Sequence, residues 1–141
     1  MNKLKSKTSL VLMELIVTIL FFSLASAVCV QLFVRSHLLN KETRELNNAI
    51  NICQSIAEVM NGTDGSLEQI QAYFPSATGD DDYFVIYYDE NFKSTLDMDN
   101  YAYCADVTVT PIGNLYNMSI LFEKKPDYDV VYSLSASKYI R

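Results

Sequence analysis

The sequence predicts an α+β fold, in which a long N-terminal helix, membrane-spanning in its first half, packs against a C-terminal antiparallel β-sheet. Three observations predict it: an apolar run over residues 10–34, a helical spacing of apolar residues that continues to residue 60, and a two-residue alternation in the last third. We divide the 141 residues into a leader (1–9), a transmembrane half of the helix (10–34), an outer half (35–61) and an antiparallel β-sheet head (62–141).

The apolar run is long enough to cross a bilayer. Residues 10–34 contain one charged side chain, Glu14, and a helix of about 20 residues spans the hydrocarbon core. An ionised carboxylate in such a segment costs roughly 2.5–3.5 kcal/mol on insertion scales, and somewhat less near an interface. Glu14 is therefore either tolerated or paired, and we interpret it as paired.

Charge on either side of the run predicts the orientation. Lys3, Lys5 and Lys7 precede it, whereas the basic residues after it are partly offset by Glu42 and Glu45. Because positive charge is retained in the cytoplasm, we expect a single-pass membrane protein with a cytoplasmic N-terminus and an extracytoplasmic C-terminal domain.

A cleavable secretory signal peptide is the alternative interpretation of the same segment. Ala25-Ser26-Ala27 matches the small-residue cleavage pattern. Against it, the apolar run continues to Val34, and Glu14 is out of place in the apolar core of a signal peptide. We therefore favour the membrane anchor.

The helical spacing does not stop at the membrane. Neither Gly nor Pro occurs between Leu10 and Asn61, which predicts one helix of about 50 residues, on the order of 75 Å long, ended by Asn61-Gly62. Its outer half has an apolar stripe at three- and four-residue steps, formed by Leu46, Ala49, Ile50, Cys53, Ile56, Ala57 and Met60.

The head is predicted to contain a short helix and four strands. Ser66-Leu67-Glu68-Gln69 has capping-box spacing and opens a helix that Pro75 ends, and Tyr83–Tyr88 is an unbroken strand buried on both faces. Alternation predicts three one-sided strands with turns at 111–114 and 125–127. Their inward residues are Tyr101, Tyr103, Ala105, Val107 and Val109, then Tyr116, Met118, Ile120 and Phe122, then Tyr128, Val130, Tyr132, Leu134 and Ala136. We expect the stripe at 46–60 to cover this sheet.

Composition argues against several functional classes. From Leu10 onward the chain has 8 Lys and Arg against 17 Asp and Glu, so we expect no direct nucleic-acid binding. No phosphate loop, zinc spacing or strained-serine motif occurs in the sequence. We interpret His37 as a solvated residue. We therefore expect no enzyme, no catalytic residue, no cofactor and no metal ligand.

Two weaker possibilities stay open. Asp97–Asn100, together with residues 80–82 or 89–90, offers oxygen ligands for Ca²⁺, although solvated loops are the favoured interpretation. Of the three cysteines, Cys29 lies in the apolar run, Cys53 faces the sheet and Cys104 alternates to the opposite sheet face. A bridge between Cys53 and Cys104 would then require a bulge or a different register.

The start of the apolar run resembles a known processing signal. Ser9 is followed by Leu10-Val11-Leu12-Met13-Glu14-Leu15, which resembles the class III signal of type IV pilin-like proteins. In that family the leader ends in Gly and a run such as Phe-Thr-Leu-Ile-Glu-Leu follows, so Ser9 and Leu10 stand here in place of Gly and Phe.

The resemblance implies a pilin-like fold and a filament function. It implies that a prepilin peptidase cleaves between Ser9 and Leu10, that the new amine of Leu10 is methylated, and that Glu14, the fifth mature residue, acts in assembly. The expected partners are sister pilin subunits, the prepilin peptidase, the inner-membrane assembly platform and the membrane. The expected function is a structural subunit, a minor pilin or pseudopilin, of a type IV pilus, type II secretion or DNA-uptake (competence) filament. The alternative is a monomeric, single-pass membrane-anchored binding domain.

Overall fold

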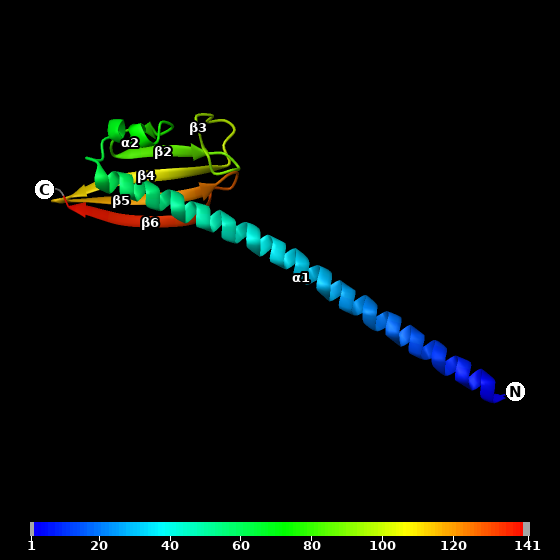
Figure 1. Cartoon of the computed structure of the whole chain (residues 1–141). Helices are drawn as coiled ribbons and strands as arrows, with labels where there is room; N and C mark the ends of the chain where they lie inside the picture. Colours follow the sequence, from blue (N-terminus) through cyan, green and yellow to red (C-terminus); the bar gives the residue numbers. More distant parts are fainter. Residues whose placement is uncertain (1, 140–141) are drawn as a thin grey trace. The chain divides into compact units, whose positions relative to one another are not determined.

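One helix occupies residues 2–62 of the chain. The structure is a computed structural model that describes residues 2–139, with side chains from residue 7 onward. Helix α1 runs from Asn2 to Gly62 without a break (Figure 1), as the absence of Gly and Pro before residue 62 predicts. Contacts divide the chain into two compact units, residues 1–42 and 43–141.

The first unit is the apolar part of α1. Every side chain from Lys7 to Glu42 is exposed. The hydroxyls of Thr18 and Ser23 donate to the carbonyls of Glu14 and Ile19, at 2.8 and 2.9 Å, so these donors are satisfied within the helix. Within the described residues, α1 is the one helix long and apolar enough to cross a membrane.

The second unit contains an antiparallel sheet. Its elements are α2 (Leu67–Tyr73), β1 (Thr78–Gly79), β2 (Tyr83–Tyr88), β3 (Ser94–Thr95), β4 (Tyr103–Ile112), β5 (Leu115–Lys124) and β6 (Asp129–Tyr139). The strand order is β1-β2-β4-β5-β6, and β3 pairs with β2. All pairs are antiparallel. Strand β2 occurs where the unbroken run at Tyr83–Tyr88 predicts it, and β4, β5 and β6 occur where alternation predicts them, whereas the two-residue strands β1 and β3 are not predicted.

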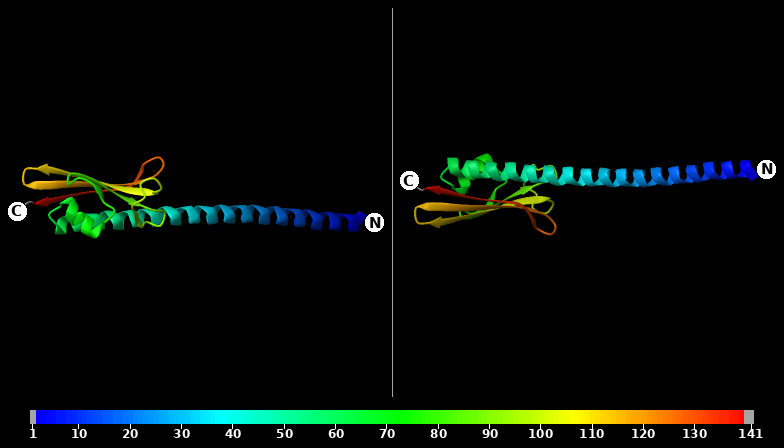
Figure 2. Two further views of the ribbon diagram at one scale, coloured as in Figure 1. Left: turned by 90° about the horizontal axis from the view of Figure 1, so that it is seen from above. Right: turned by 90° about the horizontal axis from the view of Figure 1, so that it is seen from below.

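The C-terminal part of α1 lies along one face of this sheet (Figure 2), and the core forms between them. The predicted apolar stripe is confirmed at Ala49, Cys53, Ile56, Ala57 and Met60, while Ile50 is only half-buried and Leu46 stays 41% exposed. The core joins Ala49, Cys53, Ile56, Ala57 and Met60 of α1 to Phe84, Ile86, Ala105, Val107, Met118, Ile120 and Phe122 of the sheet, with Ile70 of α2. Full burial of each large side chain stabilises the unit by roughly 1.5–3 kcal/mol.

The first hairpin turn is tighter than predicted. Pro111 was expected in the turn, but β4 continues through Pro111 and Ile112, and the turn is Gly113-Asn114 with φ +60 at the glycine. Proline is accommodated because β2 pairs with β4 only as far as Thr108. The Val109 N–H donates toward the β2 side, to the Asp82 carbonyl. The nitrogen of Pro111, two residues on, therefore faces an open edge where no donor is needed.

A β-bulge in β6 overturns part of the predicted alternation. Phe122 pairs with Tyr132, but Glu123 pairs with Val130, so Val131 is the extra residue. Val131 packs against the core. Tyr128 and Val130 were predicted to face inward, yet they are 52% and 54% exposed. The bulge is the reason, because one inserted residue exchanges the faces of every residue before it.

The predicted capping box at the start of α2 is also wrong. Ser66 occupies the N-cap position with extended backbone, but its side chain makes no capping hydrogen bond to the helix. The Ser66 hydroxyl donates instead to Asp64 at 2.6 Å. The N–H of Leu67 donates to the Asp81 carboxylate at 2.7 Å, so a residue 14 positions away satisfies this helix end.

Candidate functional site

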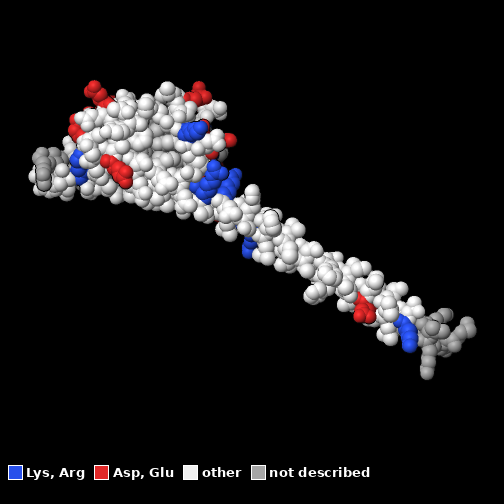
Figure 3. Space-filling model, viewed as in Figure 1, with Lys and Arg blue, Asp and Glu red and all other residues white. Residues whose placement is uncertain are grey.

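The three residues of the predicted processing and assembly site lie on α1. Ser9, Leu10 and Glu14 are all helical and exposed, and Leu10 is 64% exposed. Leu10 and Glu14 are one turn apart and therefore share a helix face. Figure 3 shows a long stretch of α1 that presents almost no charged atoms on the face in view.

Glu14 stands alone as a charge within this apolar surface. Its neighbours in a shallow recess along the helix are Val11, Leu15, Thr18 and Ile19. Within the part of the chain that the structure describes, the one salt bridge joins Lys124 to Glu45, so no ion pair reaches the Glu14 carboxylate. Residues 10–34 thus present a single carboxylate among apolar side chains that have no cover within the first unit.

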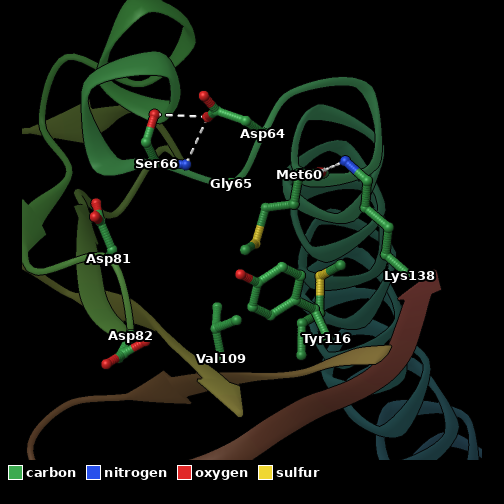
Figure 4. Close-up of a pocket in the computed structure, with 10 residues that line it drawn as sticks. Met60, Asp64, Gly65, Ser66, Asp81, Asp82, Val109, Tyr116 and Lys138 are labelled. Carbon is green, nitrogen blue, oxygen red and sulfur yellow. Dashed lines mark hydrogen bonds between the residues drawn. The ribbon is translucent and has the colours of Figure 1, made fainter. Parts of the chain in front are cut away.

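A cavity of about 300 Å³ opens in the second unit, beside the end of α1 (Figure 4). It is lined by Met60, Asp64, Gly65, Ser66, Asp81, Asp82, Val109, Tyr116, Met118 and Lys138. No local sequence pattern predicts this cavity, because its residues come from the end of α1, two loops and three strands.

Two charged groups of this cavity, Lys138 and Asp64, have partners within the chain. The Lys138 ammonium donates to the carbonyls of Met60, at 3.2 Å, and of Thr63, so it neutralises the C-terminal end of α1. The Asp64 carboxylate accepts from the Ser66 N–H and hydroxyl and from Gln69. These hydrogen bonds hold the pKa of Asp64 below its usual value. The cavity thus fixes the connection between α1 and α2.

Of the two loop pairs considered for calcium, one lines a common hollow and the other does not. Asp89, Glu90, Asp99 and Asn100 line one open hollow, but residues 81 and 82 line the cavity at α1 instead. The Asp89 carboxylate accepts from the N–H groups of Asn91 and Lys93 in its own turn. Among the described residues, these loops contain no cluster of three carboxylates close enough to hold one ion.

The three cysteines are free, and each lies in a different environment. Cys29 is exposed on α1, whereas Cys53 is buried in the core and Cys104 is buried on the opposite face of the sheet. The predicted alternation of Cys104 is confirmed, and the two buried thiols lack a disulfide. Burial raises the pKa of Cys53 to about 11 and that of Cys104 to about 12. His37 is exposed on α1, as predicted.

Comparisons with protein-family models, with curated proteins and with solved structures found no match. The features on which a function can be argued are therefore those of the molecule itself. They are a membrane-length apolar segment, the single carboxylate of residues 10–34 at Glu14, and a sheet unit built on the continuation of the same helix.

Proposed function

We propose that this chain is a structural subunit, a minor pilin or pseudopilin, of a type IV pilus, type II secretion or DNA-uptake filament. The observation that carries the proposal is the exposed apolar surface of residues 10–34 of α1, whose one carboxylate, Glu14, lies five residues after Ser9. The pilin-like motif at residues 9–15 and the combination of a long helix with an antiparallel sheet support it.

The energetic argument concerns where such a helix is stable. Residues 10–34 bury no side chain in their own unit, and transfer of this apolar surface to water is unfavourable at roughly 25 cal/mol per Å². The helix is stable in lipid, and it is equally protected when sister helices cover it. A filament core made of such helices therefore allows the subunit to leave the membrane.

Glu14 supplies the register of that core. Cleavage after Ser9 creates an ammonium group on Leu10, and this group of one subunit pairs with the Glu14 carboxylate of a neighbour. Two opposite charges that are buried together offset much of the desolvation that each would suffer alone. The remaining partners in this proposal are the prepilin peptidase and the inner-membrane assembly platform, and the sheet unit lies on the extracytoplasmic side.

Replacement of Glu14 by Leu tests the proposal. Membrane insertion of Glu14→Leu is expected to be unchanged or improved by up to a few kcal/mol, because the only charge in the run is lost. Assembly is expected to fail, because the neighbour's ammonium loses its partner, a loss of typically about 3–5 kcal/mol for buried pairs. The amounts of subunit in membranes and in sheared filaments measure the two effects separately.

Met13→Leu is the matched control, since it changes the adjacent residue without a change in charge. It is expected to assemble as the parent does. If Glu14→Leu protein reaches filaments, or cross-links to sister subunits, as well as the parent, Glu14 has no assembly role. The alternative function, a monomeric membrane-anchored binding domain in which Glu14 is protonated near the interface, would then be the better explanation.

A further inference from the structure

Three side chains with metal-binding donors meet on the sheet face that α1 does not cover. Cys104 and Asp106 are two residues apart in β4, so they point to the same face, and Glu123 of β5 is the cross-strand partner of Cys104. The Cys104 sulfur, a carboxylate oxygen of Asp106 and one of Glu123 all lie within 4.8 Å of one another. Two paired strands of the sheet thus fix the positions of all three residues.

The thiol of this group is shielded from water although no helix covers it. Cys104 is 4% exposed, and Asp106 and Glu123 are half-buried. Tyr87 of β2 pairs with Cys104 on its other side, and its ring packs against that of Tyr101 with 4.7 Å between ring centroids. The thiol therefore lies in a low-dielectric setting, where a bound cation would be held more strongly than at an open surface.

No protein cation balances these acids within residues 7–139. The contacts of the group are a hydrogen bond of 2.9 Å from the Tyr83 hydroxyl to Asp106, and a 3.8 Å approach of the Cys104 sulfur to the other Asp106 oxygen. The salt bridge of the sheet uses Lys124, whose ammonium lies on Glu45. A thiol and two carboxylates therefore share one half-buried place without a positive partner.

The pKa shifts of this group are those expected of acids without a positive partner. Burial, and then the charges of Asp106 and Glu123, raise the pKa of the Cys104 thiol to about 12. Burial and the charge of Asp106 also raise the pKa of Glu123. Burial and the neighbouring negative charge thus oppose ionisation of Cys104 and Glu123, and a divalent cation at the centre would reverse that effect for these two groups.

We propose that Cys104, Asp106 and Glu123 form a binding site for a divalent transition-metal ion of the zinc type. Zinc accepts thiolate sulfur at about 2.3 Å and carboxylate oxygen at about 2.0–2.2 Å, so tetrahedral ligands stand roughly 3.3–3.7 Å apart. The donors need to approach by about 1 Å, which side-chain torsions allow. Coordination releases the thiol proton to solvent, and the site is independent of the filament proposal.

The donor set selects the class of ion. Thiolate is a soft ligand that favours zinc, cobalt and related ions, whereas calcium and magnesium take oxygen ligands in larger numbers. Three protein ligands leave a fourth tetrahedral position for water. Sequence spacing alone predicts no metal site here, because β4 and β5 bring these residues together across a hairpin.

Cobalt is the probe, because a cobalt–thiolate bond gives a charge-transfer band in the near ultraviolet. The full chain is purified in detergent with Cys29→Ser as the background, stripped of metal with a chelator, and titrated with Co²⁺. The band is expected to saturate at one ion per chain and to disappear on addition of Zn²⁺ but not of Ca²⁺. Cys104→Ser is expected to abolish it, and Asp106→Asn or Glu123→Gln to weaken the affinity about tenfold or more.

Asp97→Asn and Glu68→Gln are the matched controls, since they remove exposed carboxylates elsewhere, and they are expected to bind Co²⁺ as the background does. Two results would overturn the site. One is a band that persists in Cys104→Ser, and the other is a Co²⁺ affinity in Asp106→Asn and Glu123→Gln that equals that of the Cys29→Ser background. A second measurement needs no substitution at the site: Zn²⁺ is expected to slow alkylation of Cys104, mapped by peptide mass, about tenfold or more. An unchanged rate would likewise contradict the proposal.

Discussion

The Glu45 carboxylate of α1 accepts a hydrogen bond from the Tyr103 hydroxyl of β4 at 2.5 Å, and the same oxygen lies 2.6 Å from the Lys124 ammonium. The side chain of Glu45 is 14% exposed, and that of Lys124 is 42% exposed. The Tyr103 ring stacks on Phe122 of the core, with ring centroids 5.5 Å apart. Burial, and the hydrogen bond to Glu45, raise the pKa of Tyr103. A charge-assisted contact thus joins α1 to the sheet at the edge of the apolar core.

Loss of this contact is expected to destabilise the second unit. Glu45→Ala removes a half-buried acceptor and leaves the Tyr103 hydroxyl without its partner, which is expected to cost about 1–3 kcal/mol of unfolding free energy. Urea unfolding followed by tyrosine circular dichroism measures it. Glu42→Ala, one turn earlier on the exposed part of α1, is the control and is expected to change stability by less than about 0.5 kcal/mol. Equal effects of the two substitutions would contradict a role for the contact.

The outer half of α1 is expected to be indispensable to the sheet. A fragment that starts at Arg35 retains Ala49, Cys53, Ile56 and Met60, whereas one that starts at Gly62 loses them and exposes the inner face of β4 and β5. The longer fragment is expected to unfold cooperatively on heating, and the shorter one to aggregate, because the lost burial equals much of a small domain's stability. A cooperative transition in the shorter fragment would refute this packing.

Two adjacent valines test the bulge in β6. Val131→Ala is expected to cost about 1 kcal/mol because this side chain packs against the core, whereas Val130→Ala is expected to change stability by less than about 0.5 kcal/mol. Ile120→Ala, fully buried in β5, provides the upper reference at about 2–5 kcal/mol. The reverse order of the two valines would show that β6 follows the simple alternation and lacks the bulge.

Asp64 is expected to contribute to the acid sensitivity of the second unit. Hydrogen bonds from Ser66 lower its pKa from the ordinary value of 3.8 in the folded chain, so the unfolded chain binds its proton more readily as the pH falls. Its stabilising effect is therefore present above pH 3.8 and is lost as the pH falls through the lowered pKa. In Asp64→Asn, the melting temperature is expected to fall less steeply than in the parent as the pH decreases below 3.8. Asp127→Asn, in an exposed turn, is the control. Identical pH profiles of the melting temperature in Asp64→Asn and Asp127→Asn would contradict the effect.

Processing gives a prediction about the mature chain. Protein isolated from its own host is expected to begin at Leu10 with a methylated amine, as the motif at residues 9–15 implies. Intact mass measures this directly. A chain that begins at Val28 would be an ordinary secreted protein, and an uncut chain would favour the monomeric anchor.

The sequence by itself determined the elements whose cause is local. The length of α1 follows from the absence of Gly and Pro before residue 62, and β2, β4 and β5 follow from short-range patterns of apolar and β-branched residues. The stripe on α1 that covers the sheet was also predicted, because a one-sided sheet needs an apolar partner and only this stripe is long enough. The motif around Glu14 is also a local feature, because adjacent residues form it.

Tertiary structure decided what depends on residues far apart in the chain. A bulge is set by how β6 pairs with β5, so alternation placed Val130 inside although Val131 takes that position. The cap of α2 was mispredicted because Asp81, 14 residues away, supplies the acceptor. Glu45 meets Tyr103 across 58 residues, and Cys104 meets Glu123 across a hairpin. Such contacts form only when strand register is fixed by the whole sheet, and no local pattern encodes that register.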